Sequence, residues 1–189
     1  MSLDKFQLKI GYQFNNIDLL IVSLTHRSKG AEHNERLEFL GDSILNFVIA
    51  ENIYLQYPEA SEGELTRMRS AIVCGSSLCD IATKLEIGDL IILGLGELSS
   101  GGRARSSILS DSVEALIGAI FLDGGIVFAK KFILEWFKNS LRSVDTKSHL
   151  KDPKTNLQEF SQRLGICLPE YRVIGMKGPE HQKIFEVSY

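Results

Sequence analysis

The sequence predicts an all-α domain followed by a smaller segment of mixed α and β structure. Three observations support this prediction. Apolar residues recur at helical spacing up to about residue 142. The polar stretch at residues 143–151 has no periodicity and is typical of a linker. Beyond it, one helical pattern precedes two strand-like patterns, so we assign a first domain to residues 1–147 and a second to residues 152–189.

The longest helix is expected over residues 35–56. Asn34 is a favourable N-cap residue, Glu35 suits the positive end of the helix dipole, and Tyr57-Pro58 ends the pattern. The remaining helices of the first domain are expected, in chain order, at residues 64–85 (one or two helices), 108–122 and 127–141, with a loop at 94–102.

The second domain begins with Asp152-Pro153, an N-cap followed by proline at the first helical position. A helical stripe of apolar residues ends at Gly165, and two strands are expected on either side of a loop at residues 175–182. The predicted order of this domain is therefore one helix and two strands.

The composition is that of a globular chain. With 189 residues, 44% of them hydrophobic, the chain is long enough to bury a sizeable core. Three cysteines without a CxxC pair argue against a disulfide framework or a cysteine-ligated zinc site. No apolar run reaches the ~18 residues of a membrane span, and the N-terminal residues do not resemble a signal peptide. We therefore expect a cytoplasmic protein with no membrane partner.

Three carboxylates share one side of the helix predicted at residues 35–56, namely Glu35, Glu38 and Asp42. Carboxylates on a helix are usually solvated. Here the acidic side continues with Phe39 and two isoleucines, so the helix is apolar nearly all round and we expect it to be buried. Glu38 and Asp42 would then lie near the protein interior, where a carboxylate is costly unless it is paired or bound to a metal.

A second acidic pair, Asp111 and Glu114, lies on one face of the helix predicted at residues 108–122. The helix dipole accounts for Asp111 but not for Glu114, which lies farther into the same apolar helix. Glu38, Asp42, Asp111 and Glu114 are then four carboxylates on two helices. They indicate a site for a hard divalent cation, Mg²⁺ with Mn²⁺ as a substitute. Such ions most often serve phosphoryl transfer or hydrolysis.

The stretch His33–Ser43 (HNERLEFLGDS), with LTHRS at 24–28 and DSVEAL at 111–116, resembles the signature of bacterial ribonuclease III, the double-stranded-RNA endonuclease. The match extends over essentially all of residues 1–142. It implies an all-α catalytic endonuclease domain. The implied roles are catalysis by Asp42 and Glu114, metal binding by Glu38, Asp111 and Glu114, and support of the site by Glu35 and Glu62.

The resemblance also implies a homodimer, because the phenylalanine matching Phe39 usually fills a cavity in the partner subunit. In the loop at residues 94–105, the core Ser-Gly-Gly-Arg is retained, but Ala104 and Ser106 stand where relatives often carry arginine and glutamate. Arg103 and Arg105 are candidates for phosphate contact. A solvated loop charge is an equally good interpretation of each.

Residues 152–189 resemble the first part of a double-stranded-RNA-binding domain, an incomplete α+β module without the third strand and the last helix. Such domains recognise the shape of A-form RNA, its 2′-hydroxyls and its phosphates. The matching RNA-contact candidates are Thr155, Gln158, Glu159 and His181.

The function that the resemblance implies is Mg²⁺-dependent cleavage of double-stranded RNA to 5′-phosphate and 3′-hydroxyl ends, in the processing of ribosomal and messenger RNA precursors. Two alternatives remain at this point. One is a double-stranded-RNA-binding protein without cleavage activity. The other is a nuclease of the same fold that acts on a ribosomal RNA precursor without a binding domain.

Overall fold

The computed structural model describes residues 1–144, 153–178 and 183–188. The chain forms two compact units, Met1–Thr146 and Lys147–Tyr189. The boundary between the two units falls within the polar stretch at residues 143–151. The domain limits of 1–147 and 152–189 stay predictions.

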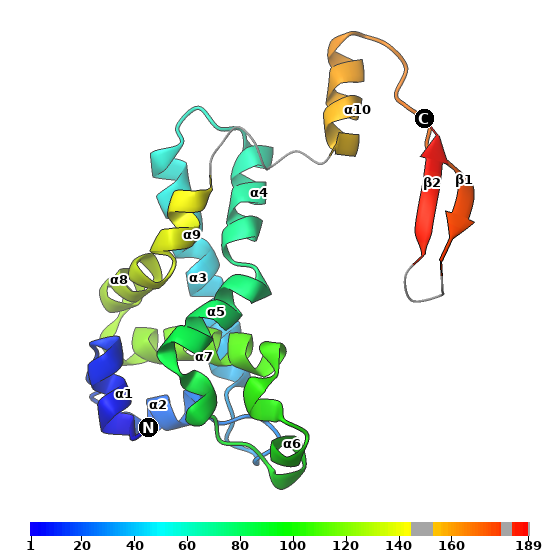
Figure 1. The fold of residues 1–189 in the computed structure, drawn as a ribbon. Coiled ribbons are helices and arrows are strands. Elements are labelled where there is room, and N and C mark those ends of the chain that lie inside the picture. Colours follow the sequence, from blue (N-terminus) through cyan, green and yellow to red (C-terminus); the bar gives the residue numbers. More distant parts are fainter. Residues whose placement is uncertain (145–152, 179–182, 189) are drawn as a thin grey trace. The chain divides into compact units, whose positions relative to one another are not determined.

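The first unit is a bundle of α-helices, as the sequence predicts (Figure 1). Its helices are α1 (Leu3–Ile10), α2 (Ile17–Ser23), α3 (Glu35–Gln56), α4 (Glu62–Ile72), α5 (Gly75–Leu85), α6 (Leu95–Ser99), α7 (Ser106–Gly124), α8 (Ile126–Trp136) and α9 (Lys138–Ser143). Short 3₁₀ turns at Ile87–Asp89 and Gly102–Ala104 join α5 to α6 and α6 to α7.

The ends of several helices differ from expectation. Helix α4 starts at Glu62, two residues early, because Ser61 and Glu64 form a capping box: the Ser61 hydroxyl accepts from the Glu64 amide, and the Glu64 carboxylate accepts from the Ser61 amide. Asn34 occupies the N-cap position of α3, as predicted, but its side chain makes no capping hydrogen bond. Sequence patterns locate a helix well and its ends less well.

Two segments were assigned incorrectly from the sequence. The stretch predicted as a loop at residues 94–102 contains the short helix α6. The single helix expected at residues 127–141 is two helices, α8 and α9, which meet at the fully buried Phe137.

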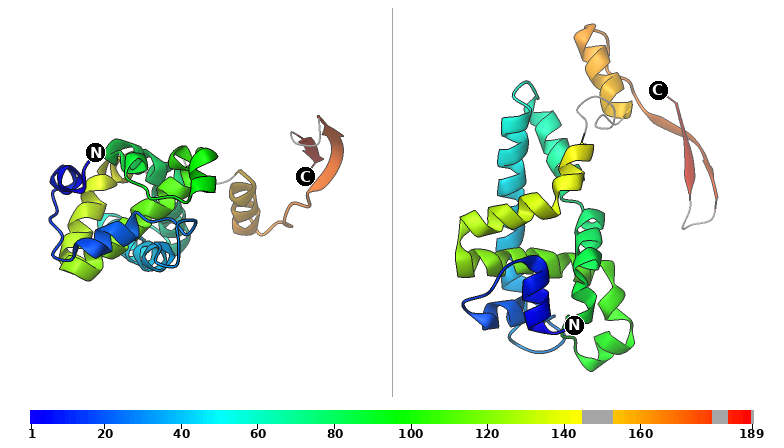
Figure 2. Two further views of the ribbon diagram at one scale, coloured as in Figure 1. Left: turned by 90° about the horizontal axis from the view of Figure 1, so that it is seen from below. Right: turned by 60° about the vertical axis from the view of Figure 1, so that its left-hand side comes forward.

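Helices α3 and α7 form the centre of the first unit and share its largest helix–helix contact. They cross steeply in the views of Figures 1 and 2. Their backbones approach closely where Gly41 of α3 and Gly118 of α7 meet. A Cβ atom at Gly41 would overlap the carbonyl of Glu114, and one at Gly118 would overlap the carbonyl of Leu37. The crossing therefore brings the acidic part of α3 against the acidic part of α7.

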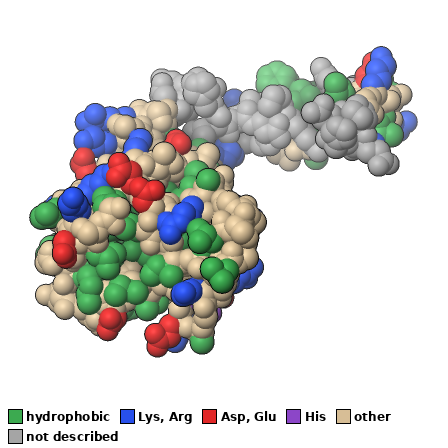
Figure 3. Space-filling model, turned by 60° about the horizontal axis from the view of Figure 1, so that its bottom comes forward, with side chains coloured by type: hydrophobic (Ala, Val, Ile, Leu, Met, Phe, Trp, Pro, Cys, Tyr) green, Lys and Arg blue, Asp and Glu red, His purple; other side chains and the backbone are tan. Residues whose placement is uncertain are grey.

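The surface of the first unit carries mixed charge. On the face that Figure 3 shows, acidic and basic side chains are interspersed, in keeping with a net charge of only −3 for the chain. Contacts with a polyanion must then rely on local groups rather than on a broad basic field. Among the described residues, no helix has both the length and the apolar character that crossing a bilayer requires.

The second unit contains α10 (Pro153–Arg163), β1 (Arg172–Lys177) and β2 (Ile184–Ser188). The two strands are antiparallel, with Met176 opposite Phe185 and an irregularity between Val173 and Gly175. The observed helix–strand–strand order is the one predicted for the incomplete α+β module.

Candidate metal centre

Three carboxylates meet where α3 crosses α7. Glu38 of α3 and Asp111 and Glu114 of α7 each offer an oxygen atom, and these oxygens lie within 4.8 Å of one another. All three side chains are half-buried. The i, i+3 spacing places Asp111 and Glu114 on the same face of α7, as the sequence predicts.

Burial and mutual repulsion raise the pKa values of these carboxyl groups. Burial, then the charges of Asp42, Glu38 and Asp111, raises the pKa of Glu114 to about 7. Burial and the neighbouring carboxylates likewise raise the pKa of Glu38, with Asp111 the strongest of them. The pKa of Asp111 is also raised, mainly by burial, although Ser110, His26 and Arg27 oppose the shift. A cluster that resists full ionisation is one that a divalent cation would stabilise.

Asp42 lies beside this cluster but is not part of it. Its side chain is exposed, so the expectation that it lies near the interior is wrong for the single chain. The Asn46 side-chain amide donates to Asp42 Oδ1 over 2.7 Å and fixes the carboxylate on the outer face of α3. Among the charges that raise the pKa of Glu114, that of Asp42 is the largest contributor, which places it within electrostatic reach of the cluster.

A pocket of about 460 Å³ adjoins the cluster. Its lining residues come from the segment before α3, from α3 itself, from α6, from the residue before α7 and from α7: His26, Arg27, Ser28, Asn34, Glu35, Glu38, Glu97, Arg105, Ser107, Ile108 and Asp111. Glu35, the predicted supporting residue, pairs with Arg27 across 3.1 Å. Carboxylates and guanidinium groups therefore line the same cavity.

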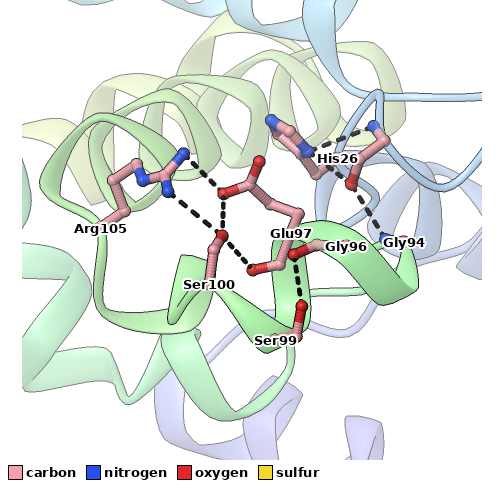
Figure 4. A network of polar contacts seen from close by, with 8 residues as sticks. His26, Gly94, Gly96, Glu97, Ser99, Ser100 and Arg105 are labelled. Carbon is pink, nitrogen blue, oxygen red and sulfur yellow. Dashed lines mark hydrogen bonds and ion pairs between the residues drawn. The ribbon is translucent and has the colours of Figure 1, made fainter.

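The loop between α5 and α7 closes one side of this pocket (Figure 4). Arg105 pairs with Glu97 across 2.6 Å and donates to the Ser100 hydroxyl. Arg103 donates instead to the backbone carbonyl oxygens of Gly88 and Asp89. Arg103 thus holds the loop together, and of the two predicted phosphate contacts only Arg105 lines the pocket.

Other predicted residues lie elsewhere. Phe39 is 78% exposed on α3. Glu62 accepts a hydrogen bond from Thr66 and lines a different groove, so the single chain does not bring it to the carboxylate cluster. In the second unit Gln158 is half-buried on α10. The side chains of Thr155 and Glu159, and the whole of His181, lie outside the described residues.

Sequence reasoning assigned no role to several residues that line the pocket, notably His26, Ser28, Asn34 and Glu97. His26 and Ser28 lie in the stretch LTHRS, which carried part of the resemblance, and this was the available signal. No pattern of spacing could have placed Glu97 here, because it lies on the short helix α6, which has too few residues to show a period.

Comparisons with known proteins show which family the chain resembles. A family model described as Ribonuclease-III-like matches residues 16–141. Ribonuclease 3 of Histophilus somni is 52% identical over 188 residues, covering 100% of this chain and 84% of that protein. Ribonuclease 3 of Vibrio atlanticus is 49% identical over 186 residues, covering 98% and 83%.

Solved structures give the same result. The nuclease domain of ribonuclease III from Campylobacter jejuni superposes with a TM-score of 0.72 at 39% identity, covering 75% of this chain and 99% of that one. Dicer from Pichia stipitis gives a TM-score of 0.54 at 27% identity, covering 92% and 80%. The chain belongs to the ribonuclease III family, and it is an endoribonuclease with the all-α nuclease fold of that family.

Proposed function

We propose that this endoribonuclease is Mg²⁺-dependent, that it cuts both strands of double-stranded RNA, and that it leaves 5′-phosphate and 3′-hydroxyl ends. The observation that supports this proposal best is the group of three carboxylates, Glu38, Asp111 and Glu114, at the crossing of α3 and α7. The identity of its relatives as ribonuclease 3 favours RNA as the substrate.

The donor set fits a hard divalent cation. All the donors are carboxylate oxygens, which Mg²⁺ and Mn²⁺ prefer and which suit zinc or copper less well. Burial first, and then the charges of the neighbouring carboxylates, raise the pKa of Glu114, and a bound cation would offset both effects. Glu38, Asp111 and Glu114 would hold the ion. When bound, the ion would supply a water of lowered pKa and charge stabilisation at the phosphate.

The chain's own residues account for the rest of the reaction. Asn46 engages one oxygen of Asp42, which leaves the other oxygen to orient the attacking water. The water oxygen forms a bond to phosphorus, and the bond from phosphorus to the 3′ oxygen breaks. The phosphate stays on the 5′ end, and the 3′ oxygen takes up a proton to become a hydroxyl group.

We also propose that the enzyme acts as a homodimer. Phe39 projects from the same helix that carries Glu38 and Asp42, and a groove of about 710 Å³ between α3 and α4 offers an apolar receptacle lined by Phe47, Tyr54 and Leu65. Because a knob and a groove occur on the same chain, two copies related by a two-fold axis could exchange them. The Campylobacter jejuni nuclease domain has a region involved in dimer formation.

The second unit supports a double-stranded substrate. Its helix–strand–strand order is that of the first part of a double-stranded-RNA-binding domain. We propose that the duplex is bound through its A-form shape and that Gln158 contributes from α10. Thr155, Glu159 and His181 stay predicted contacts, and cytoplasmic RNA precursors are the proposed substrates.

The decisive experiment incubates a long perfect RNA duplex with the protein in Mg²⁺, in Ca²⁺ and in EDTA, at low salt. We expect fragments in Mg²⁺ alone, with ends that a 5′-kinase labels only after phosphatase treatment. Binding in all ionic conditions without fragments in any would overturn the proposal and favour the double-stranded-RNA-binding protein that does not cleave.

A further inference from the structure

The imidazole of His26 is fixed in one orientation by a chain of hydrogen bonds (Figure 4). The Ser28 backbone N–H donates to His26 Nδ1 over 3.2 Å, and Ser28 Oγ lies 2.9 Å from the same nitrogen. The Gly94 amide in turn donates to Ser28 Oγ over 2.9 Å. The contact with Gly94 joins residues 66 positions apart in the chain.

These contacts determine which ring nitrogen carries the proton. A backbone N–H only donates, so Nδ1 must accept and is unprotonated. The Ser28 hydroxyl, which already accepts from Gly94, directs its own hydrogen at Nδ1. The one proton of the neutral imidazole therefore resides on Nε2.

The Nε2 atom is directed towards the pocket beside the carboxylates. Figure 4 shows the His26 ring extending towards the side where Glu97 and Arg105 lie. These three residues and Ser28 line the pocket. Among the described residues, no acceptor is hydrogen-bonded to Nε2. The arginines of the pocket differ in this respect, since Arg27 is paired with Glu35 and Arg105 with Glu97.

Asn34 gives a second indication that the pocket takes a polar ligand. It is only 2% exposed, it lines the pocket, and its side-chain amide makes no hydrogen bond among the described residues. The His26 donor and the Asn34 amide are therefore both available to a polar ligand in this cavity.

We propose that His26 Nε2–H donates a hydrogen bond to a non-bridging oxygen of the RNA phosphate that is cut, and that Ser28 and Gly94 keep it in the donating tautomer. This assignment rests on the proposed function. The assignment adds to the proposed function a direct contact between the protein and the phosphate, in which the carboxylates take no part. The Gly94 amide can reach Ser28 because residue 94 has no side chain, since a Cβ atom there would overlap the Ser28 carbonyl.

Two substitutions at His26 distinguish loss of the Nε2–H donor from loss of the contact between Nδ1 and Ser28. His26→Asn places an amide near the position of Nδ1, where it can still accept from Ser28, but it does not reach the pocket. His26→Gln places an amide N–H near the position of Nε2. We expect His26→Asn to slow single-turnover cleavage of a duplex RNA by about 10- to 100-fold, the loss of one hydrogen bond to a charged group. His26→Gln should stay within about fivefold of the unchanged protein, because it restores a donor.

Two binding measurements keep this effect apart from damage to the metal centre. Mn²⁺ binding followed by electron paramagnetic resonance, and duplex binding in Ca²⁺, should change less than about threefold in His26→Asn, since the lost hydrogen bond matters most when phosphate charge develops. Ser28→Ala removes the hydroxyl that contacts His26 Nδ1. Its matched control is Ser99→Ala, which removes an α6 hydroxyl that donates to the Gly96 carbonyl and should cleave normally.

The tautomer itself can be read by long-range ¹H–¹⁵N correlation on protein with ¹⁵N-labelled histidine, with the signal assigned by its loss in His26→Asn. We expect the Nε2–H pattern in the unchanged protein and a still predominant Nε2–H pattern in Ser28→Ala, because the Ser28 backbone N–H remains to donate to Nδ1. An Nδ1–H pattern, normal cleavage by His26→Asn, or a slow rate matched by lost Mn²⁺ binding would each overturn the assignment. Equal slowing by His26→Gln and His26→Asn would do the same. Unchanged protein that fails to cut any duplex in Mg²⁺ would instead refute the proposed function.

Discussion

Burial of Glu114 disfavours the negative charge that the side chain needs in order to bind a cation. Glu114 is the carboxylate of the cluster whose pKa rises to about 7, yet it must be ionised to hold a cation. We expect Glu114→Gln to abolish cleavage of duplex RNA, because an amide is a poor ligand for Mg²⁺, and to leave dimerisation unchanged. Glu135→Gln, on an exposed glutamate of α8, is the matched control and should cleave normally. Equal turnover by Glu114→Gln and the unchanged protein would refute the assignment of this residue.

The same carboxyl group predicts how the stability of the metal-free protein depends on pH. The pKa of Glu114 in the folded state, about 7, lies above its ordinary value of 4.5, so the folded protein holds this proton more tightly than the unfolded chain does. The free energy of unfolding should therefore fall as the pH rises from 4.5 through about 7.

Glu114→Gln removes this penalty. At pH 8 in EDTA we expect the variant to melt about 2–4 °C higher than the unchanged protein, which corresponds to about 1 kcal/mol after allowance for solvent screening. At pH 4 the difference should vanish, and adding Mg²⁺ at pH 8 should raise the melting temperature of the unchanged protein alone. Identical melting curves at pH 8 would contradict the raised pKa.

Helix packing, rather than the acidic side chains themselves, brings the cluster together. The close approach of α3 and α7 depends on Gly41, where any Cβ atom would overlap the carbonyl of Glu114. Gly41→Ala should destabilise the protein by about 1–3 kcal/mol, the cost of overpacking, and should weaken Mn²⁺ binding by moving Glu114 away from Glu38. Denaturant unfolding and Mn²⁺ titration measure the two effects.

A glycine elsewhere provides the control for this substitution. Gly63 lies in α4, and a Cβ atom there would meet only the Arg67 side chain at 3.4 Å. Gly63→Ala should stabilise the protein by about 0.5–1 kcal/mol, because alanine favours the helix. If Gly41→Ala behaved like Gly63→Ala, the close approach of α3 and α7 would not be what positions the carboxylates.

The elements differ in how far the sequence could predict them. Long helices with strong periodicity, such as α3 and α7, were predicted within two residues at each end because burial of one face dominates their pattern. The short helix α6 has too few residues to show a period. The break between α8 and α9 depends on how Phe137 packs, which only tertiary contacts decide.

The site was predictable to a similar extent. Glu38, Asp111 and Glu114 could be identified because each pair of acids interrupts an apolar helix, and the structure brings these three together. The exposure of Asp42 could not be foreseen, since a face that is apolar in sequence was interpreted as interior. The contact of Ser28 with Gly94 spans two loops, and no local pattern encodes it.

For the molecule as a whole, the exposed apolar face of α3 is the feature that a single chain leaves unexplained. Phe39, Phe47 and Tyr54 are all more than half exposed on this helix. Apolar side chains that gather on one exposed face usually mark an interaction site. An interface on this face would also cover the outer side of α3 where Asp42 lies, and it would make the apolar pattern of the whole helix consistent with burial.

Phe39 and Leu8 allow a direct test of this interface, because both side chains are 78% exposed but they lie on different helices, α3 and α1. Phe39→Ala should weaken the dimer by about 10- to 100-fold, as expected for truncation of an aromatic side chain that fills a pocket in a partner. Leu8→Ala should leave it unchanged. Sedimentation velocity over a range of low protein concentrations measures both, and circular dichroism verifies that the variants fold. If Phe39→Ala sedimented like the unchanged protein, Phe39 would matter no more for dimerisation than Leu8 does. This face of α3 would then serve another purpose than the dimer interface.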